Sequence, residues 1–104
     1  MNESGFQDFM KKKRKSDGTI KTCIEVVKEV ESYLLSSDFS LDTISTKEFE
    51  LLIKENLNPM RVSKFLWSLG YYFLFIGRTD LLKTAYEMRG KEIKKVRKSF
   101  KLKE

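Results

Sequence analysis

The chain has 104 residues, of which 40% are apolar and 12% aromatic, enough for one hydrophobic core and too few for two. Five glycines and one proline are too few for the turns of an all-β domain, so a compact all-α bundle of four to five helices is expected. The most apolar stretch, residues 65–76, is well short of the ~20 residues that cross a bilayer, which excludes a membrane span.

The first two predicted helices flank a basic block. Residues 4–14 carry an apolar stripe of Phe6, Phe9 and Met10, and their last turn is basic, as suits a helix C-terminus. Ser16 is the expected N-cap of the second helix. The apolar positions of that helix have the most regular helical spacing in the chain: Ile20, Cys23, Ile24, Val27, Val30 and Leu34.

The connection after the second helix is a polar loop. Three apolar residues are expected to pin it to the core: Phe39, Leu41 and Ile44. Ser45 and Glu48 then form an S-x-x-E capping box, which begins a third helix that ends near Asn56. The buried face of this helix consists of Phe49, Leu52 and Ile53.

A fourth helix begins at Asn58 and Pro59, since proline suits the first helical position and asparagine caps it. Gly77 is placed to end it in the left-handed conformation, and Gly70 to let a neighbouring helix approach. One face is apolar throughout: Val62, Phe65, Leu66, Leu69, Phe73 and Ile76. Additional aromatic residues make this the expected central helix: Trp67, Tyr71, Tyr72 and Phe75.

The last helix begins at Thr79 or Asp80 and continues the core stripe as far as Arg89. Beyond it the apolar positions thin to Ile93, Val96 and Phe100 among lysines. We therefore divide the chain into a helical bundle domain, residues 1–90, and a basic C-terminal extension, residues 91–104. This extension is either an amphipathic helix or a segment that orders on binding.

The formal net charge of +6 is concentrated at the two ends. One block comprises Lys11, Lys12, Lys13, Arg14 and Lys15, and the other Lys91, Lys94, Lys95, Arg97, Lys98, Lys101 and Lys103. Residues 16–90 carry nine basic and eleven acidic side chains, so the body is slightly acidic. Clustered cations can release counterions from a phosphate backbone. The same charges would also suit solvated tails, an anionic membrane surface or an acidic protein.

Catalytic chemistry has little support in the sequence. The chain has no histidine, which removes the commonest general base and metal ligand. Cys23 is the single cysteine and falls on an apolar helical stripe, so a buried hydrophobe is favoured over a nucleophile or zinc ligand. No glycine-rich nucleotide-binding motif is present. We expect a non-enzymatic protein that needs no cofactor or metal. Without a disulfide or a signal-peptide segment after Met1, a cytoplasmic, intracellular location is expected.

Two stretches of residues 5–77 resemble the N-terminal core-binding domain of tyrosine recombinases, the family of the phage integrases. The first is Arg14-Lys15-Ser16-Asp17-Gly18-Thr19-Ile20-Lys21-Thr22, preceded by Phe6-Gln7-Asp8-Phe9-Met10. The second is residues 58–77, similar to that domain's last core helix, with Arg61, Lys64, Leu66, Leu69, Tyr72, Phe73 and Phe75. Cys23 stands where an aromatic residue is common in the family. The family's catalytic residues lie in a second domain that has no counterpart here.

The resemblance implies a SAM-like helical bundle that holds one side of a DNA duplex without cleaving it. It places contacts at the N-terminus of the second helix, where free N–H groups also form an anion site. The expected DNA-binding residues, including the basic ends, are Lys11, Lys12, Lys13, Arg14, Lys15, Ser16, Thr19, Lys21, Thr22, Arg61, Lys64, Lys94, Lys95, Arg97 and Lys98. The competing interpretations are that Ser16 only caps the helix, and that Thr19 and Thr22 are ordinary exposed helix surface.

Two further alternatives stay open. The nucleic acid could be RNA in place of double-stranded DNA. The chain could instead be a helical protein-interaction module, a homo-oligomer formed through an aromatic surplus that one helix face cannot bury: Trp67, Tyr71, Tyr72, Phe75 and Tyr86. If the domain belongs to a recombinase, a catalytic partner domain would supply the chemistry.

Overall fold

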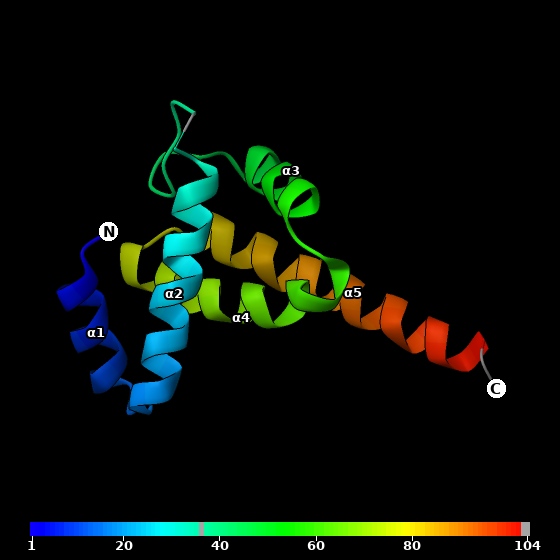
Figure 1. The fold of residues 1–104 in the computed structure, drawn as a ribbon, viewed down its shortest axis with the longest axis horizontal. Helices are drawn as coiled ribbons and strands as arrows, with labels where there is room; N and C mark the ends of the chain where they lie inside the picture. Colours follow the sequence, from blue (N-terminus) through cyan, green and yellow to red (C-terminus); the bar gives the residue numbers. More distant parts are fainter. Residues whose placement is uncertain (36, 103–104) are drawn as a thin grey trace.

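The computed structural model of the chain describes residues 1–35 and 37–102, with the side chains of all of these except Pro59 and residues 92–102. Over this range it contains five α-helices and no strand (Figure 1). The helices are α1 (Glu3–Lys12), α2 (Asp17–Tyr33), α3 (Thr46–Asn56), α4 (Pro59–Ile76) and α5 (Thr79–Leu102). The expected all-α bundle of four to five helices is confirmed.

The predicted N-caps begin three of the helices. The side-chain oxygens of Ser16, Ser45 and Asn58 each accept a backbone N–H of the first helical turn, at 3.0–3.2 Å. The expected capping box at α3 is only half formed, because the Glu48 carboxylate does not accept the Ser45 N–H. Its Oε2 is instead buried without a hydrogen-bond partner among the described residues. Asn2 caps α1, accepting a backbone N–H at 3.1 Å.

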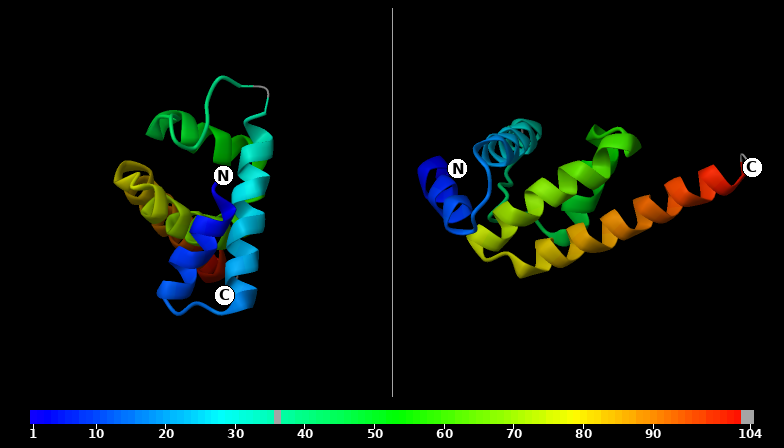
Figure 2. Two further views of the ribbon diagram at one scale, coloured as in Figure 1. Left: turned by 90° about the vertical axis from the view of Figure 1, so that its left-hand side faces the viewer. Right: turned by 90° about the horizontal axis from the view of Figure 1, so that it is seen from below.

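Helices α4 and α5 form an antiparallel hairpin, and α5 runs along one side of the molecule (Figure 2). Helix α2 packs across α4, α1 contacts both α2 and α4, and α3 packs against α5. The last turns of α5 extend beyond the other helices (Figure 1). Because α5 is continuous through Gly90, the basic extension begins within a helix, and the division at residue 90 stays a prediction. Within the described range, no helix has the length and apolar character needed to cross a membrane.

The core forms where the predicted apolar stripes meet. The fully buried side chains come from all five helices and include Phe6, Met10, Val27, Val30, Phe49, Ile53, Leu66, Leu69, Phe73 and Leu81. Leu41 and Ile44 are buried and pin the α2–α3 loop as expected. The expectation that Phe39 does the same is wrong, since its side chain is 43% exposed. Phe39 lies just before the hydrogen-bonded turn from Ser40 to Thr43, which brings only the later apolar residues inward.

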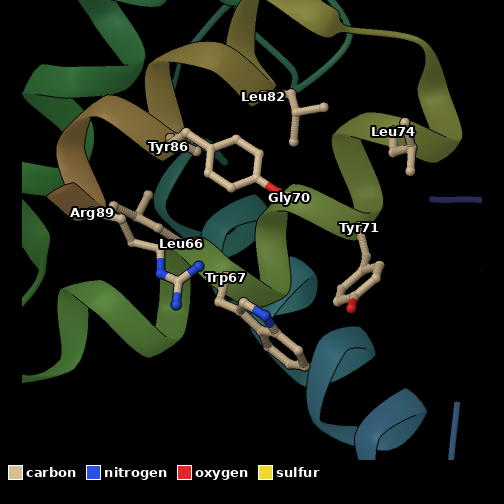
Figure 3. Close-up of a pocket in the computed structure, with 9 residues that line it drawn as sticks. Leu66, Trp67, Gly70, Tyr71, Leu74, Leu82, Tyr86 and Arg89 are labelled. Atoms are coloured by element: carbon tan, nitrogen blue, oxygen red, sulfur yellow. The ribbon is translucent and has the colours of Figure 1, made fainter.

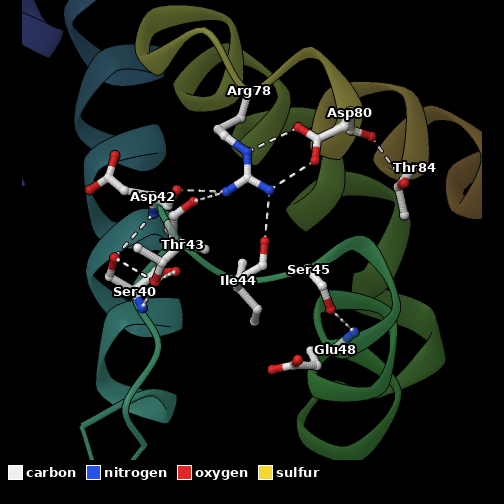
Figure 4. A network of polar contacts seen from close by, with 10 residues as sticks. Ser40, Asp42, Thr43, Ile44, Ser45, Glu48, Arg78, Asp80 and Thr84 are labelled. Carbon is white, nitrogen blue, oxygen red and sulfur yellow. Dashed lines mark hydrogen bonds and ion pairs between the residues drawn. The ribbon is translucent and has the colours of Figure 1, made fainter.

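Arg78, which the sequence analysis did not single out, joins the α4–α5 turn to the α2–α3 loop (Figure 4). Its guanidinium donates to three backbone carbonyl oxygens, those of Leu41, Asp42 and Ile44, at 3.3, 2.8 and 2.7 Å. It also donates to both carboxylate oxygens of Asp80, at 3.0 and 2.8 Å. These bonds use all five N–H donors of the side chain. Chiefly because Arg78 donates to it, the pKa of Asp80 falls to about 2.

Candidate nucleic-acid interface

The basic segment, residues 11–15, forms the end of α1 and the connection to α2. Its first four side chains are exposed, and that of Lys15 is half-buried. No carboxylate in the described part of the chain forms an ion pair with any of the five. A phosphate approaching this segment would therefore find five cations that no described carboxylate pairs with.

Two lysines of the basic segment lie over aromatic rings. The Nζ of Lys13 is 5.3 Å from the ring centroid of Phe9, and the Nζ of Lys15 is 5.0 Å from that of Tyr71. Contacts at these distances are cation–π interactions. Since Tyr71 belongs to α4, the second contact holds the end of the basic segment against the central helix.

The backbone of the basic segment ends α1 in a Schellman motif. The Lys15 N–H bonds to the Met10 carbonyl at 3.2 Å, and the Arg14 N–H to the Lys11 carbonyl at 2.9 Å. Arg14 has φ 60°, which makes it the only non-glycine residue with positive φ in the described part of the chain. A side chain in this conformation costs about 1–2 kcal/mol. The turn thus keeps a cation where stability alone would favour glycine.

The N-terminus of α2 leaves two backbone donors open. Ser16 Oγ accepts the Thr19 N–H and donates to Thr19 Oγ1 at 2.9 Å, so the capping role of Ser16 is confirmed. Thr22 Oγ1 donates to the Gly18 carbonyl at 3.0 Å. The N–H groups of Asp17 and Gly18 have no acceptor among the described residues. Free N–H groups at a helix N-terminus are the donors that an anion would use there, although the Asp17 carboxylate lies beside them.

Arg61 and Lys64 line a groove of about 380 Å³ between α2 and α4, together with Thr22. The fold thus brings together three of the predicted contacts. Glu25 and Glu29 line the same groove, and Arg61 pairs with Glu29 at 3.5 Å. With two carboxylates beside two cations, this groove would attract a phosphate less strongly than the basic segment would.

Lys11 and Lys21 lie in a second groove of about 390 Å³, between α1 and α2. Its lining also contains Lys28 and three carboxylates: Glu3, Asp17 and Glu25. Lys28 pairs with Glu3 at 3.1 Å, so this groove is also mixed in charge. The remaining predicted contacts, Lys94, Lys95, Arg97 and Lys98, belong to α5, and their side chains lie outside the described residues.

An apolar pocket of about 120 Å³ opens between α4 and α5 (Figure 3). Trp67 and Tyr71 of α4 line it with their rings 5.0 Å apart, and Tyr86 lines it from α5. Trp67 is 37% exposed and Tyr86 64%, whereas Tyr72 is buried. The aromatic surplus was visible in the sequence. The pocket was not, because its position depends on which residues of α5 face α4, including Arg89.

Two buried titratable groups have shifted pKa values. Cys23 is fully buried, and burial raises the pKa of its thiol. Burial also raises the pKa of Tyr72, to about 12. Among the side chains that the structure describes, no three potential metal ligands come together.

Comparisons of the chain with protein-family models, with curated proteins and with solved structures find no match. The likeness to the core-binding domain of recombinases therefore rests on the sequence pattern alone.

Proposed function

We propose that this protein is a non-catalytic DNA-binding domain that grips the phosphate backbone of duplex DNA, as the core-binding domain of a site-specific recombinase does. The observation that carries the proposal is the basic segment, whose five adjacent cations make no ion pair with a described carboxylate. Such cations gain affinity by releasing counterions condensed on DNA. Contacts of this kind position a protein on DNA and read no base sequence.

The other predicted contacts would extend the interface from this segment. The N–H groups of Asp17 and Gly18 follow it directly. Lys64 lies two helical turns before Tyr71 on α4, about 10 Å along the helix axis from the ring that Lys15 covers. A phosphate backbone held by the basic segment can thus also approach the α2–α4 groove.

Binding to a short duplex, measured by fluorescence anisotropy at two salt concentrations, tests the proposal. The affinity should fall by orders of magnitude between about 50 and 200 mM salt if six or more phosphates are contacted. Absence of binding at the lower salt concentration would refute the proposal. Tighter binding to an RNA duplex of the same sequence would instead make RNA the ligand.

A charge-reversal pair assigns the binding to the basic segment. Lys12→Glu with Lys13→Glu replaces two exposed cations. It should weaken duplex binding at least tenfold and flatten the dependence of log affinity on log salt by about two, one for each lost phosphate contact. Lys47→Glu with Lys54→Glu on α3 makes the same change in net charge at exposed positions and is the control. Equal losses in the two double variants would mean that net charge alone attracts DNA.

A homo-oligomeric protein-interaction module is the second candidate, favoured by the exposure of Trp67, Leu74 and Tyr86 on the α4–α5 surface. Sedimentation equilibrium tests it, since association through this surface gives a mass that rises with concentration. A monomer throughout the micromolar range would contradict it.

A further inference from the structure

The α4–α5 pocket has walls suited to a flat ring. Trp67, Tyr71 and Tyr86 contribute aromatic surface to its lining, and Leu66 and Leu82 contribute aliphatic surface (Figure 3). The exposed fractions of Trp67 and Tyr86 leave both rings within reach of a ligand. Stacking between aromatic side chains and nucleobases tolerates any base, because every base has a π-face.

Gly70 leaves the space at the middle of the pocket. A Cβ built on Gly70 would lie 3.4 Å from Leu82 Cδ1, so even a methyl group would take up room between the two helices. Figure 3 shows Tyr86 reaching from α5 toward Gly70. The volume of about 120 Å³ is similar to that of cavities of about 150 Å³ that hold a benzene molecule. The pocket therefore has room for one ring and not for the several apolar side chains that a docked helix would insert.

Two described cations lie beside the pocket. Arg89 lines one end, where its Nε lies 3.4 Å from Ser63 Oγ. At the other end, the Lys15 ammonium covers the ring of Tyr71. No carboxylate lines the pocket among the side chains that the structure describes. A ligand that combines a flat ring with a neighbouring anion matches this arrangement.

We infer that the α4–α5 pocket receives one unpaired nucleobase of a DNA strand whose phosphates lie on the basic segment. This rests on the proposed function, and it adds that the protein prefers DNA with an unpaired base beside a duplex. The basic segment and the pocket are continuous, because Lys15 contacts Tyr71 and Tyr71 packs edge-on against Trp67. A strand can therefore keep its phosphates on the cations while one base turns into the pocket.

Three DNA ligands test the inference: a blunt duplex, the same duplex with a single-stranded thymidine tail, and that tailed duplex with abasic sites replacing the tail bases. Trp67 is the only tryptophan, so its fluorescence reports directly on the pocket. We expect the thymidine tail to raise affinity about tenfold over the blunt duplex and to quench Trp67. The abasic tail, which keeps the phosphates, should do neither.

Substitutions at two pocket residues, Tyr86 and Gly70, assign the gain to the pocket. Tyr86→Ala should remove most of the tail's tenfold advantage and Tyr86→Phe should restore it, because the phenyl ring still stacks. Gly70→Ala should reduce the advantage by filling the pocket, and alanine at a helical position leaves the fold intact. Phe39→Ala, which removes an exposed aromatic side chain outside the pocket, is the matched control and should leave all three affinities unchanged.

Equal affinity for the thymidine and abasic tails, with no change in Trp67 fluorescence, would overturn the inference while leaving duplex binding in place. A Trp67 signal that follows protein concentration without DNA would also overturn it, and would make a second copy of the chain the occupant. Failure of all three DNA ligands to bind would refute the proposed function itself.

Discussion

The α1–α2 and α4–α5 connections share one backbone motif. The cation of the α4–α5 connection is bonded within the fold, whereas those of the α1–α2 connection are mostly exposed. At the end of α4, the Arg78 N–H bonds to the Phe73 carbonyl at 2.9 Å and the Gly77 N–H to the Leu74 carbonyl at 3.4 Å. The same Schellman pattern ends α1 through the N–H groups of Lys15 and Arg14. The left-handed position is Gly77 in one turn and Arg14 in the other, with φ 75° and 60°.

The difference lies in what surrounds the cations. The side chain of Arg78 is 21% exposed, and its donors are all engaged by the α2–α3 loop and Asp80. Those of the basic segment are mostly exposed and lack described carboxylate partners. Arg78 therefore stabilises the fold, whereas the cations of the basic segment are available to a ligand. Substitutions in the two turns should therefore separate stability from the proposed DNA binding.

The largest expected effect is that of Arg78→Ala. Three carbonyl oxygens and one carboxylate lose their donor at once, and hydrogen bonds from a charged group contribute the most. We expect the free energy of unfolding in urea to fall by about 3 kcal/mol. Arg78→Lys should recover little of it, because one ammonium cannot reproduce the planar set of donors. A loss below about 1 kcal/mol would show that water replaces the guanidinium.

Asp80→Asn separates the ion pair from the carbonyl contacts. It should destabilise less than Arg78→Ala, because the bonds to the loop remain. The pKa of Asp80 is lowered from 3.8 to about 2, so its contribution is complete above pH 3.8 and is lost as the pH falls toward 2. The stability difference between the parent and the variant should therefore shrink over that interval in acid titrations. A difference independent of pH would contradict the assigned ion pair.

The sequence predicted the helices better than their connections. Helix starts at Ser16, Ser45 and Asn58 follow from local hydrogen-bonding chemistry, and the buried faces follow from helical spacing. The role of Arg78 could not be predicted, because its carbonyl acceptors lie more than 30 positions earlier in the chain. The exposure of Phe39 depends on a loop conformation that no periodic pattern determines.

Only part of the candidate site could be predicted, because contacts between residues far apart in the chain follow no local pattern. Charge clustering identified the basic segment directly. Helical spacing could not show that Glu29 pairs with Arg61, a contact between residues 32 positions apart. The contact of Lys15 with Tyr71, which joins the basic segment to the pocket, likewise depends on how α4 packs against the start of α2.

Gly77→Ala should have the next largest effect on stability. It tests the cost of the left-handed backbone conformation alone, because no side-chain contact is lost. No atom lies within 4 Å of a Cβ placed on Gly77, so the cost comes from the left-handed conformation and not from a clash. We expect a loss of about 1 kcal/mol in the free energy of unfolding. Gly18→Ala in α2, where φ is not positive and the space is also open, should not destabilise the protein. Equal effects at the two glycines would contradict the explanation.

Arg14→Gly should have the smallest effect on stability and the opposite sign. It relieves the left-handed strain at φ 60°, although glycine also gives the unfolded chain more freedom. The net gain should be about 0.5 kcal/mol in urea unfolding, with weaker duplex binding because one phosphate contact is lost. Arg14→Asn serves as the control, since asparagine removes the cation but tolerates this conformation. If Arg14→Gly left duplex affinity unchanged, Arg14 would not contact phosphate, and the strain at this position would have no explanation in DNA binding.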